Sequence, residues 1–107
     1  MPTKKDTIAA IATPPGTSGI GVIRVSGLSS KNIFKALTGT KPKNRSAQYV
    51  SFKSSENEVL DRGISLFFQG PASYTGEDTM ECFIHGNRML LDMLLSEIFS
   101  LGARPAL

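Results

Sequence analysis

Short apolar runs, separated by turn residues, follow one another through most of this chain. Each run is rich in β-branched or aromatic residues and is bounded by glycine, proline, serine or asparagine, the pattern of short β-strands. The polar turn at 54–57 joins two of these runs, so we expect a hairpin there. The runs predict five strands, at residues 6–12, 20–26, 47–53, 59–69 and 80–84.

Two other stretches have the apolar spacing of α-helices. The first follows Ser29 and Ser30, either of which can cap it, and ends before Gly39. The second begins after Asn87, a good N-cap, and ends before Gly102. Their apolar positions are Ile33, Phe34 and Leu37 in the first helix, and Leu90, Leu91, Leu94, Leu95, Ile98 and Leu101 in the second.

About five strands with two to three helices predict an α/β (α+β) fold, in which helices pack on a small mixed β-sheet. The 107 residues suffice for one hydrophobic core, so residues 1–107 are expected to form one domain. Pro105 lacks a backbone donor and would confine any strand near it to a sheet edge.

Composition places the chain among globular proteins, with 40% apolar and 20% charged residues. It has no apolar run of membrane-spanning length, and its first residues are polar, without a signal-peptide core. One cysteine and one histidine are too few for a disulfide framework or a structural zinc site. We therefore expect a cytoplasmic protein without a bound metal.

The net charge of +3 conceals an asymmetry between the two halves of the chain. Residues 1–53 hold nine lysines and arginines and one acidic residue. Residues 54–107 hold three basic residues and eight acidic residues. A basic surface could attract an anion such as RNA or a polyglutamate tail. A solvated surface facing an acidic half explains the same pattern and is the simpler interpretation.

The glycines at positions 16, 19 and 21 resemble a nucleotide-binding loop only superficially. They precede a predicted strand, whereas a phosphate-binding loop opens a helix whose amides point at the anion. The chain contains no G-x-x-x-x-G-K-[ST] motif. It should therefore hydrolyse no nucleotide by itself, and we assign no catalytic residue.

Residues 70–86 concentrate the polar chemistry of the chain. Two turn-like breaks, the second carrying Glu77 and Asp78, precede a short strand that contains Glu81 and ends at His85. A succession of loop, strand and helix start is where α/β proteins commonly bind ligands. Cys82 faces the side opposite to Glu81 in an extended strand, so we interpret it as a core residue. His85 has no triad partner in sequence and is interpreted as a strand-end histidine with a satisfied ring.

Arg24 and Glu81 each interrupt an apolar strand with a charge. A charge in such a position needs a partner, water or a ligand, so the two residues could pair with each other or bind a ligand. A carboxylate can accept two hydrogen bonds from an amino-pyrimidinone edge, and an arginine can hold a carboxylate or a carbonyl. The two residues would suit a pterin, although this chemistry alone does not select that ligand.

Several motifs in register along the chain resemble the tRNA-modification GTPase family called MnmE or TrmE. The motifs are Asp6-Thr7-Ile8, Ala12-Thr13-Pro14-Pro15-Gly16, the run from Gly19 to Gly27, Gly70-Pro71, Ser73-Tyr74-Thr75-Gly76-Glu77-Asp78, Glu81 and His85-Gly86. They match the family's N-terminal domain only. The resemblance implies that the chain is this folate-binding and dimerisation domain, C-terminally incomplete and without the helical and GTPase domains.

The resemblance also implies a ligand and a fold. The family's N-terminal domain is similar to the tetrahydrofolate-binding domain of glycine-cleavage aminomethyltransferases, and it binds 5-formyl-tetrahydrofolate or a related one-carbon folate as a homodimer. The family's folate contacts fall on Arg24 and Glu81. Gly19 and Gly21 would let the backbone approach the ligand, and Glu77, Asp78 and His85 are further candidate pocket-lining residues.

Whole proteins of this family hydrolyse GTP, with magnesium and potassium, in a domain that this chain lacks. With the flavin-dependent partner MnmG, also called GidA, they modify the 5-position of the wobble uridine of tRNA. Two other functions remain open from the sequence: a dimerisation scaffold that binds no ligand, and a basic RNA-binding module. The RNA-binding function would need aromatic residues interleaved with the lysines and arginines, and the basic half contains few: Phe34, Tyr49 and Phe52.

Overall fold

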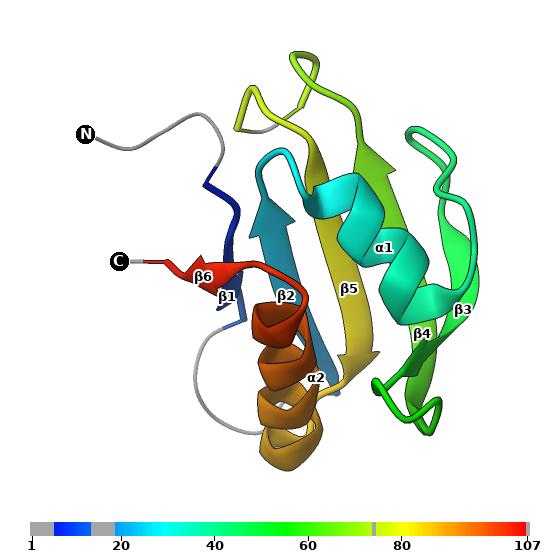
Figure 1. Ribbon diagram of the computed structural model, residues 1–107. Helices are drawn as coiled ribbons and strands as arrows, with labels where there is room; N and C mark the ends of the chain where they lie inside the picture. Colours follow the sequence, from blue (N-terminus) through cyan, green and yellow to red (C-terminus); the bar gives the residue numbers. More distant parts are fainter. Residues whose placement is uncertain (1–5, 14–18, 74, 107) are drawn as a thin grey trace.

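A computed structural model of the protein describes residues 6–13, 19–73 and 75–106 (Figure 1). These residues form six strands and two helices: β1 (Ile8–Ile11), β2 (Ile20–Ser26), α1 (Ser30–Thr38), β3 (Gln48–Lys53), β4 (Val59–Phe68), β5 (Thr79–His85), α2 (Arg88–Ser100) and β6 (Arg104–Pro105). The five predicted strands and both predicted helices are confirmed, with bounds that differ by at most two residues at either end.

The strands form one mixed sheet in the order β3-β4-β5-β2-β1-β6. All neighbouring pairs are antiparallel except β1 and β6, which run parallel. The two-residue strand β6 adds a sixth strand to the expected five. It contains Pro105 and lies at the edge of the sheet, where the missing backbone donor of proline leaves no ladder bond unmade.

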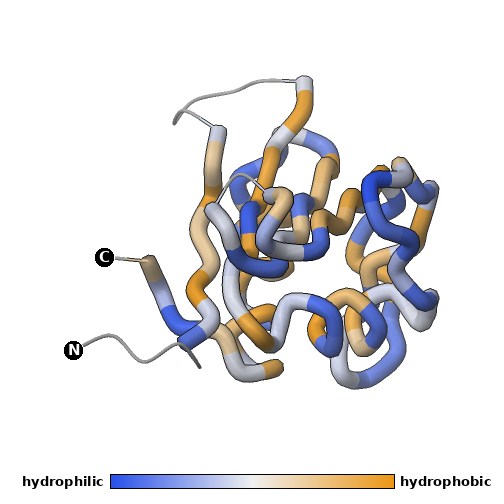
Figure 2. Tube along the Cα trace, turned by 90° about the horizontal axis from the view of Figure 1, so that it is seen from above, coloured by the Kyte–Doolittle hydropathy of each residue, from blue (hydrophilic) through white to orange (hydrophobic). Residues whose placement is uncertain are grey.

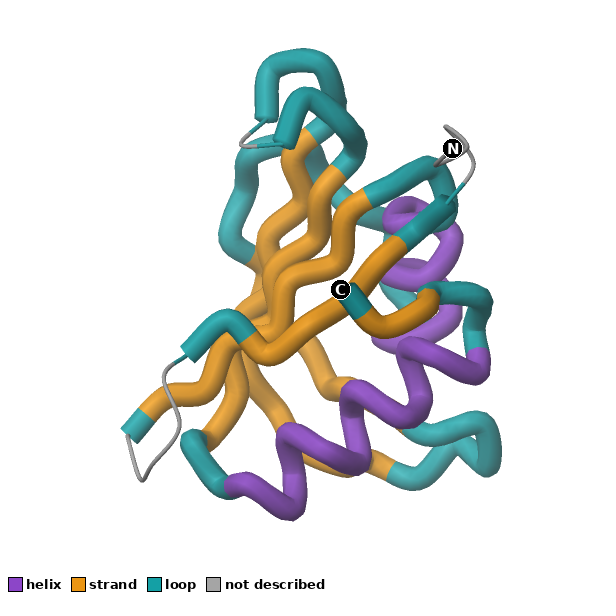
Figure 3. The backbone as a smooth tube through the Cα atoms, turned by 90° about the vertical axis from the view of Figure 1, so that its left-hand side faces the viewer, coloured by secondary structure: helices purple, strands orange, loops and turns teal. Residues whose placement is uncertain are grey.

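Both helices pack on the same face of the sheet (Figures 1 and 3). The core lies between these two layers, because alternate residues of each strand point toward the helices. Fully buried side chains from both layers meet there; the largest are Phe34, Phe52, Ile23, Ile33, Leu37, Met80, Leu94 and Ile98. Burial of these side chains is the main favourable contribution to folding.

Two helix ends follow the predicted capping residues, whereas Ser29 stands at the N-cap position of α1 without a side-chain capping hydrogen bond. The side chain of Asn87 accepts a hydrogen bond from the backbone amide of Leu90 at 3.1 Å, which satisfies one free donor at the start of α2. Gly39 ends α1 in the left-handed conformation, with φ of 67°, and its amide bonds the carbonyl of Lys35. Local sequence thus sets the start of α2 and the end of α1.

The second face of the sheet carries no helix. Its outward positions form rows across neighbouring strands, and one row joins Tyr49, Ile64, Phe83 and Val22 through consecutive pairs. The sheet is not uniform from edge to edge: hydrophobic colouring follows β1, whereas the connector before β3 and the β3–β4 hairpin are mostly hydrophilic (Figure 2). This helix-free face, called the open face below, is where the two charges singled out in the sequence lie.

Candidate functional site

Arg24 and Glu81 lie side by side on the open face. β2 and β5 pair so that these two residues stand directly opposite each other. Both the Nε and the Nη2 atoms of Arg24 lie 2.9 Å from Oε2 of Glu81. The side chains are 38% and 16% exposed, so the ion pair is partly shielded from water. The sequence left open whether Arg24 and Glu81 pair with each other or bind a ligand. In the structure they form an ion pair with each other.

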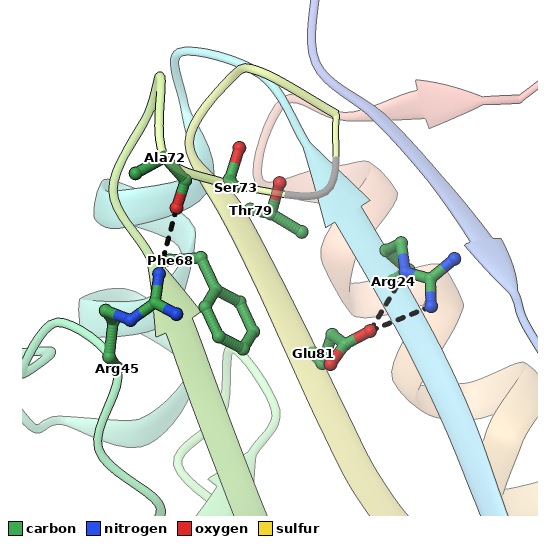
Figure 4. Close-up of a pocket in the computed structure, with 7 residues that line it drawn as sticks. All are labelled: Arg24, Arg45, Phe68, Ala72, Ser73, Thr79 and Glu81. Carbon is green, nitrogen blue, oxygen red and sulfur yellow. Dashed lines mark hydrogen bonds and ion pairs between the residues drawn. The ribbon is translucent and has the colours of Figure 1, made fainter.

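This pair forms one side of a pocket of about 560 Å³. The opposite side comes from Arg45, in the connector between α1 and β3, and from Phe68, at the end of β4 (Figure 4). Ala72 and Ser73, from the loop between β4 and β5, close the upper end in this view. The complete lining among the described residues is Arg24, Arg45, Phe68, Ala72, Ser73, Thr79 and Glu81. A volume of this size is typical of small-molecule sites.

The loop from Gly70 to Asp78 is held by its own acidic residues. Oδ1 of Asp78 accepts the amide hydrogen of Gly70 at 2.9 Å, and Oε2 of Glu77 accepts the hydroxyl hydrogen of Ser26 at 3.1 Å. Both acidic residues line a separate hollow beside Leu28 rather than the Arg24–Glu81 pocket. They fasten the loop that closes the pocket and do not themselves line it.

The glycines near the start of β2 lie away from the pocket. Gly19 stands at the other end of β2, where its carbonyl accepts the amide hydrogen of Gly86. Gly21 faces the helices: a Cβ atom there would approach the side chain of Leu91 to 2.7 Å. Gly21 therefore lets α2 pack closely on β2. Gly16, Thr17 and Ser18 lie outside the described residues, as does Tyr74 of the Ser73–Asp78 motif.

His85 also lies at the far end of β5 from the pocket. Its Nδ1 atom is 2.9 Å from Oδ2 of Asp61, and its backbone amide donates to the same oxygen at 3.0 Å. The ring is 75% exposed. Burial alone would raise the pKa of Asp61, but hydrogen bonds from His85 and from the Arg62 amide bring that pKa below its ordinary value. The interpretation of His85 as a strand-end histidine with a satisfied ring is confirmed.

Cys82 is fully buried on the helix side of β5, which confirms its interpretation as a core residue. Burial raises the pKa of its thiol, and the nearby Glu81 carboxylate raises it further, so the thiol stays protonated at neutral pH. No cluster of metal-ligating side chains occurs among the described residues. In the same part of the chain, neither helix is long and apolar enough to cross a membrane.

Sequence reasoning missed five residues of the pocket. Phe68 and Thr79 could have been found, because alternation along β4 and β5 places them on the same face as Glu81. Arg45 gave no such signal, since it lies in an irregular connector. Its place depends on the left-handed backbone at φ of 62° and on its amide bond to the Phe67 carbonyl. Ala72 and Ser73 lie in the loop between β4 and β5, where the sequence does not predict which way a side chain points.

Comparison with known proteins gives consistent matches over nearly the whole chain. The family model described as the GTP-binding protein TrmE N-terminus matches residues 7–107. The tRNA modification GTPase MnmE of a Marinomonas species is 53% identical over 104 residues, covering 97% of this chain and 23% of that protein. MnmE of Photobacterium profundum is 50% identical over 102 residues, covering 94% of this chain and 22% of that protein.

The chain thus spans about a fifth to a quarter of the length of the curated relatives it matches. The family-model match covers all the described strands and helices and both charges of the open-face pair. This chain belongs to the TrmE N-terminus family, and it corresponds to the N-terminal domain of the tRNA modification GTPases called MnmE or TrmE.

Proposed function

We propose that this domain binds a tetrahydrofolate and forms a homodimer within a GTPase that modifies tRNA. The observation that carries the proposal is the pocket on the open face, which brings together the two charges that interrupt the apolar strands. Arg24 and Glu81 would be the folate-binding residues. The ligand would be 5-formyl-tetrahydrofolate or a related one-carbon folate.

The residues present fit a pterin ring. Oε2 of Glu81 receives both bonds from Arg24, whereas Oε1 accepts no hydrogen bond from any described residue. A carboxylate with one oxygen fixed by arginine and the other directed into a pocket can accept hydrogen bonds from an amino-pyrimidinone edge. Arg24 would fix the orientation of Glu81 and hold a carbonyl or carboxylate of the ligand.

The open face supports the dimer. An antiparallel sheet that meets water on one side normally alternates apolar and polar residues, with the polar ones outward. Here the outward row contains Tyr49, Ile64, Phe83 and Val22, and Tyr49 is 73% exposed. An apolar row left uncovered on a sheet face indicates a partner surface. We propose that a second copy of this domain provides it.

The remaining functions belong to the whole protein. The relatives are named tRNA modification GTPases, and the chain covers under a quarter of their length. We propose that the parent protein hydrolyses GTP with magnesium and potassium in another domain. It would act in the cytoplasm with the flavin-dependent partner MnmG, or GidA, on the wobble uridine of tRNA.

Calorimetric titration with 5-formyl-tetrahydrofolate tests the ligand, and sedimentation with and without folate tests the dimer. Glu81→Ala should weaken folate binding at least about tenfold, because hydrogen bonds to a charged group contribute roughly 1.5–3 kcal/mol. Glu56→Ala, which removes an exposed carboxylate from the β3–β4 turn, is the matched control and should bind like the wild type.

The Arg24–Glu81 ion pair also favours a second candidate, a scaffold that dimerises without a ligand, since the two charges satisfy each other. Equal folate affinity in Glu81→Ala and wild type would overturn the proposed binding site. A folded dimer that binds no folate would establish the scaffold instead.

A further inference from the structure

The pocket contains a second arginine that neither the motifs nor the family resemblance singles out. Arg45 is exposed, yet several contacts fix its position. Its amide donates to the carbonyl of Phe67 at 2.8 Å, and the neighbouring Asn44 accepts the amide hydrogen of Gln69 at the same distance. These backbone links attach the connector to the end of β4.

The guanidinium group of Arg45 is also held in place. It lies over the ring of Phe68, with Cζ 5.8 Å from the ring centroid, and Nη1 donates to the carbonyl of Ala72 at 3.1 Å. Figure 4 shows the group at the side of the pocket opposite Arg24, with Phe68 and Glu81 between the two arginines. An arginine held by an aromatic ring and a carbonyl loses little further freedom when it binds an anion.

The charges in the pocket do not balance. Arg24 and Glu81 neutralise each other, and Arg45 forms no ion pair with a carboxylate of any described residue. The lining therefore carries one surplus positive charge. Only one of the five N–H donors of this guanidinium bonds within the described structure, so its planar edge can still receive an anion.

We propose that Arg45 is a further ligand-binding residue, which pairs with a carboxylate of the molecule that occupies the pocket. The inference rests on the proposed folate site and extends it. A folate has a neutral ring for Glu81 at one end and a glutamate carboxylate at the other, so one ligand can reach both sides. A fork of parallel donors is the geometry in which arginine recognises carboxylates.

A purely structural role for Arg45 would predict something different. Its bonds to Phe68 and Ala72 could simply attach the connector to the loop above the pocket. In that case, replacing it would disturb every ligand of the pocket equally. A ligand without a carboxylate distinguishes the two roles.

The experiment compares two ligands on four proteins by calorimetry. The ligands are 5-formyl-tetrahydrofolate and 6-methyltetrahydropterin, which has the ring but no glutamate. The proteins are the wild type, Arg45→Gln, Arg45→Lys and the control Arg88→Gln, which removes an exposed arginine from α2. Thermal unfolding of each variant verifies that the fold is intact.

We expect Arg45→Gln to weaken folate binding about fivefold, the upper range for an exposed ion pair, and to leave the pterin unchanged. The folate loss should shrink at high salt, because screening weakens an exposed pair. Arg45→Lys should restore part of the affinity, and Arg88→Gln should match the wild type.

The possible failures are distinct. If folate binds the wild type and Arg45→Gln equally well, or if the variant loses both ligands to the same extent, Arg45 does not bind the carboxylate and the folate site stands. If the wild type binds neither ligand, the folate site is wrong and the role of Arg45 is wrong with it.

Discussion

In the part of the chain that the structure describes, two pairs of a carboxylate and a basic side chain involve β5, and they differ in which groups the carboxylate bonds. Among the described residues, the carboxylate of Glu81 bonds only the side chain of Arg24, and both residues line a pocket. Asp61 bonds the ring of His85 and also its backbone amide. The ladder between β4 and β5 ends at the pair of Ile64 and Phe83, so the carboxylate of Asp61 supplies the next acceptor.

The difference shows which carboxylate is available for a ligand. Asp61 replaces a missing ladder carbonyl, and its bonds fasten the end of β5 to β4. The Glu81 side chain replaces nothing in the backbone, and its Oε1 atom accepts no bond within the described structure. We therefore expect the Asp61 pair to govern stability and the Glu81 pair to govern binding.

The largest expected effect on stability is from Asp61→Ala. The change removes an acceptor from the His85 amide and should lower the free energy of unfolding by about 1 kcal/mol, the usual net worth of one hydrogen bond. Urea unfolding measures it. Asp61→Asn, which keeps one oxygen, should lose less. A larger loss in Glu81→Ala than in Asp61→Ala would reverse the comparison.

Acidification should weaken the same pair. Because the pKa of Asp61 is lowered in the folded protein, its stabilising contribution is complete above the ordinary pKa of 3.8 and disappears as pH falls through the folded value. The difference in unfolding free energy between the wild type and Asp61→Asn should therefore stay constant from neutral pH down to about pH 4 and narrow over the pH range below it, where the carboxylate protonates. A constant difference over that range would show that ionisation of Asp61 contributes nothing.

The smallest expected effect is from His85→Ala. The ring is mostly exposed, and pairs of this kind contribute roughly 0.3 kcal/mol, whereas the backbone amide of residue 85 keeps its bond to Asp61. Thermal unfolding should change little, and folate titration should match the wild type because His85 lies away from the pocket. A clear loss of folate affinity would place the histidine in the site after all.

Much of the site could be anticipated from alternation along strands. Arg24 and Glu81 were recognisable because each places a charge in an apolar run. The same period of two places Gly21 on the face opposite Arg24, so its packing against Leu91 was also predictable in principle. Asp61 was not, because its role arises where the β4–β5 ladder ends, and no local pattern marks that point.

The sequence by itself determined five of the six strands, both helices, the Asn87 cap of α2 and the Gly39 end of α1, since these depend on propensity and on contacts within a few residues. Only the tertiary structure decided the register that sets Arg24 against Glu81, 57 residues away, and the position of Arg45 across the pocket. The physical reason is that register and pocket closure arise when distant segments pack together, and a shift of one residue would turn the same side chains to the opposite face.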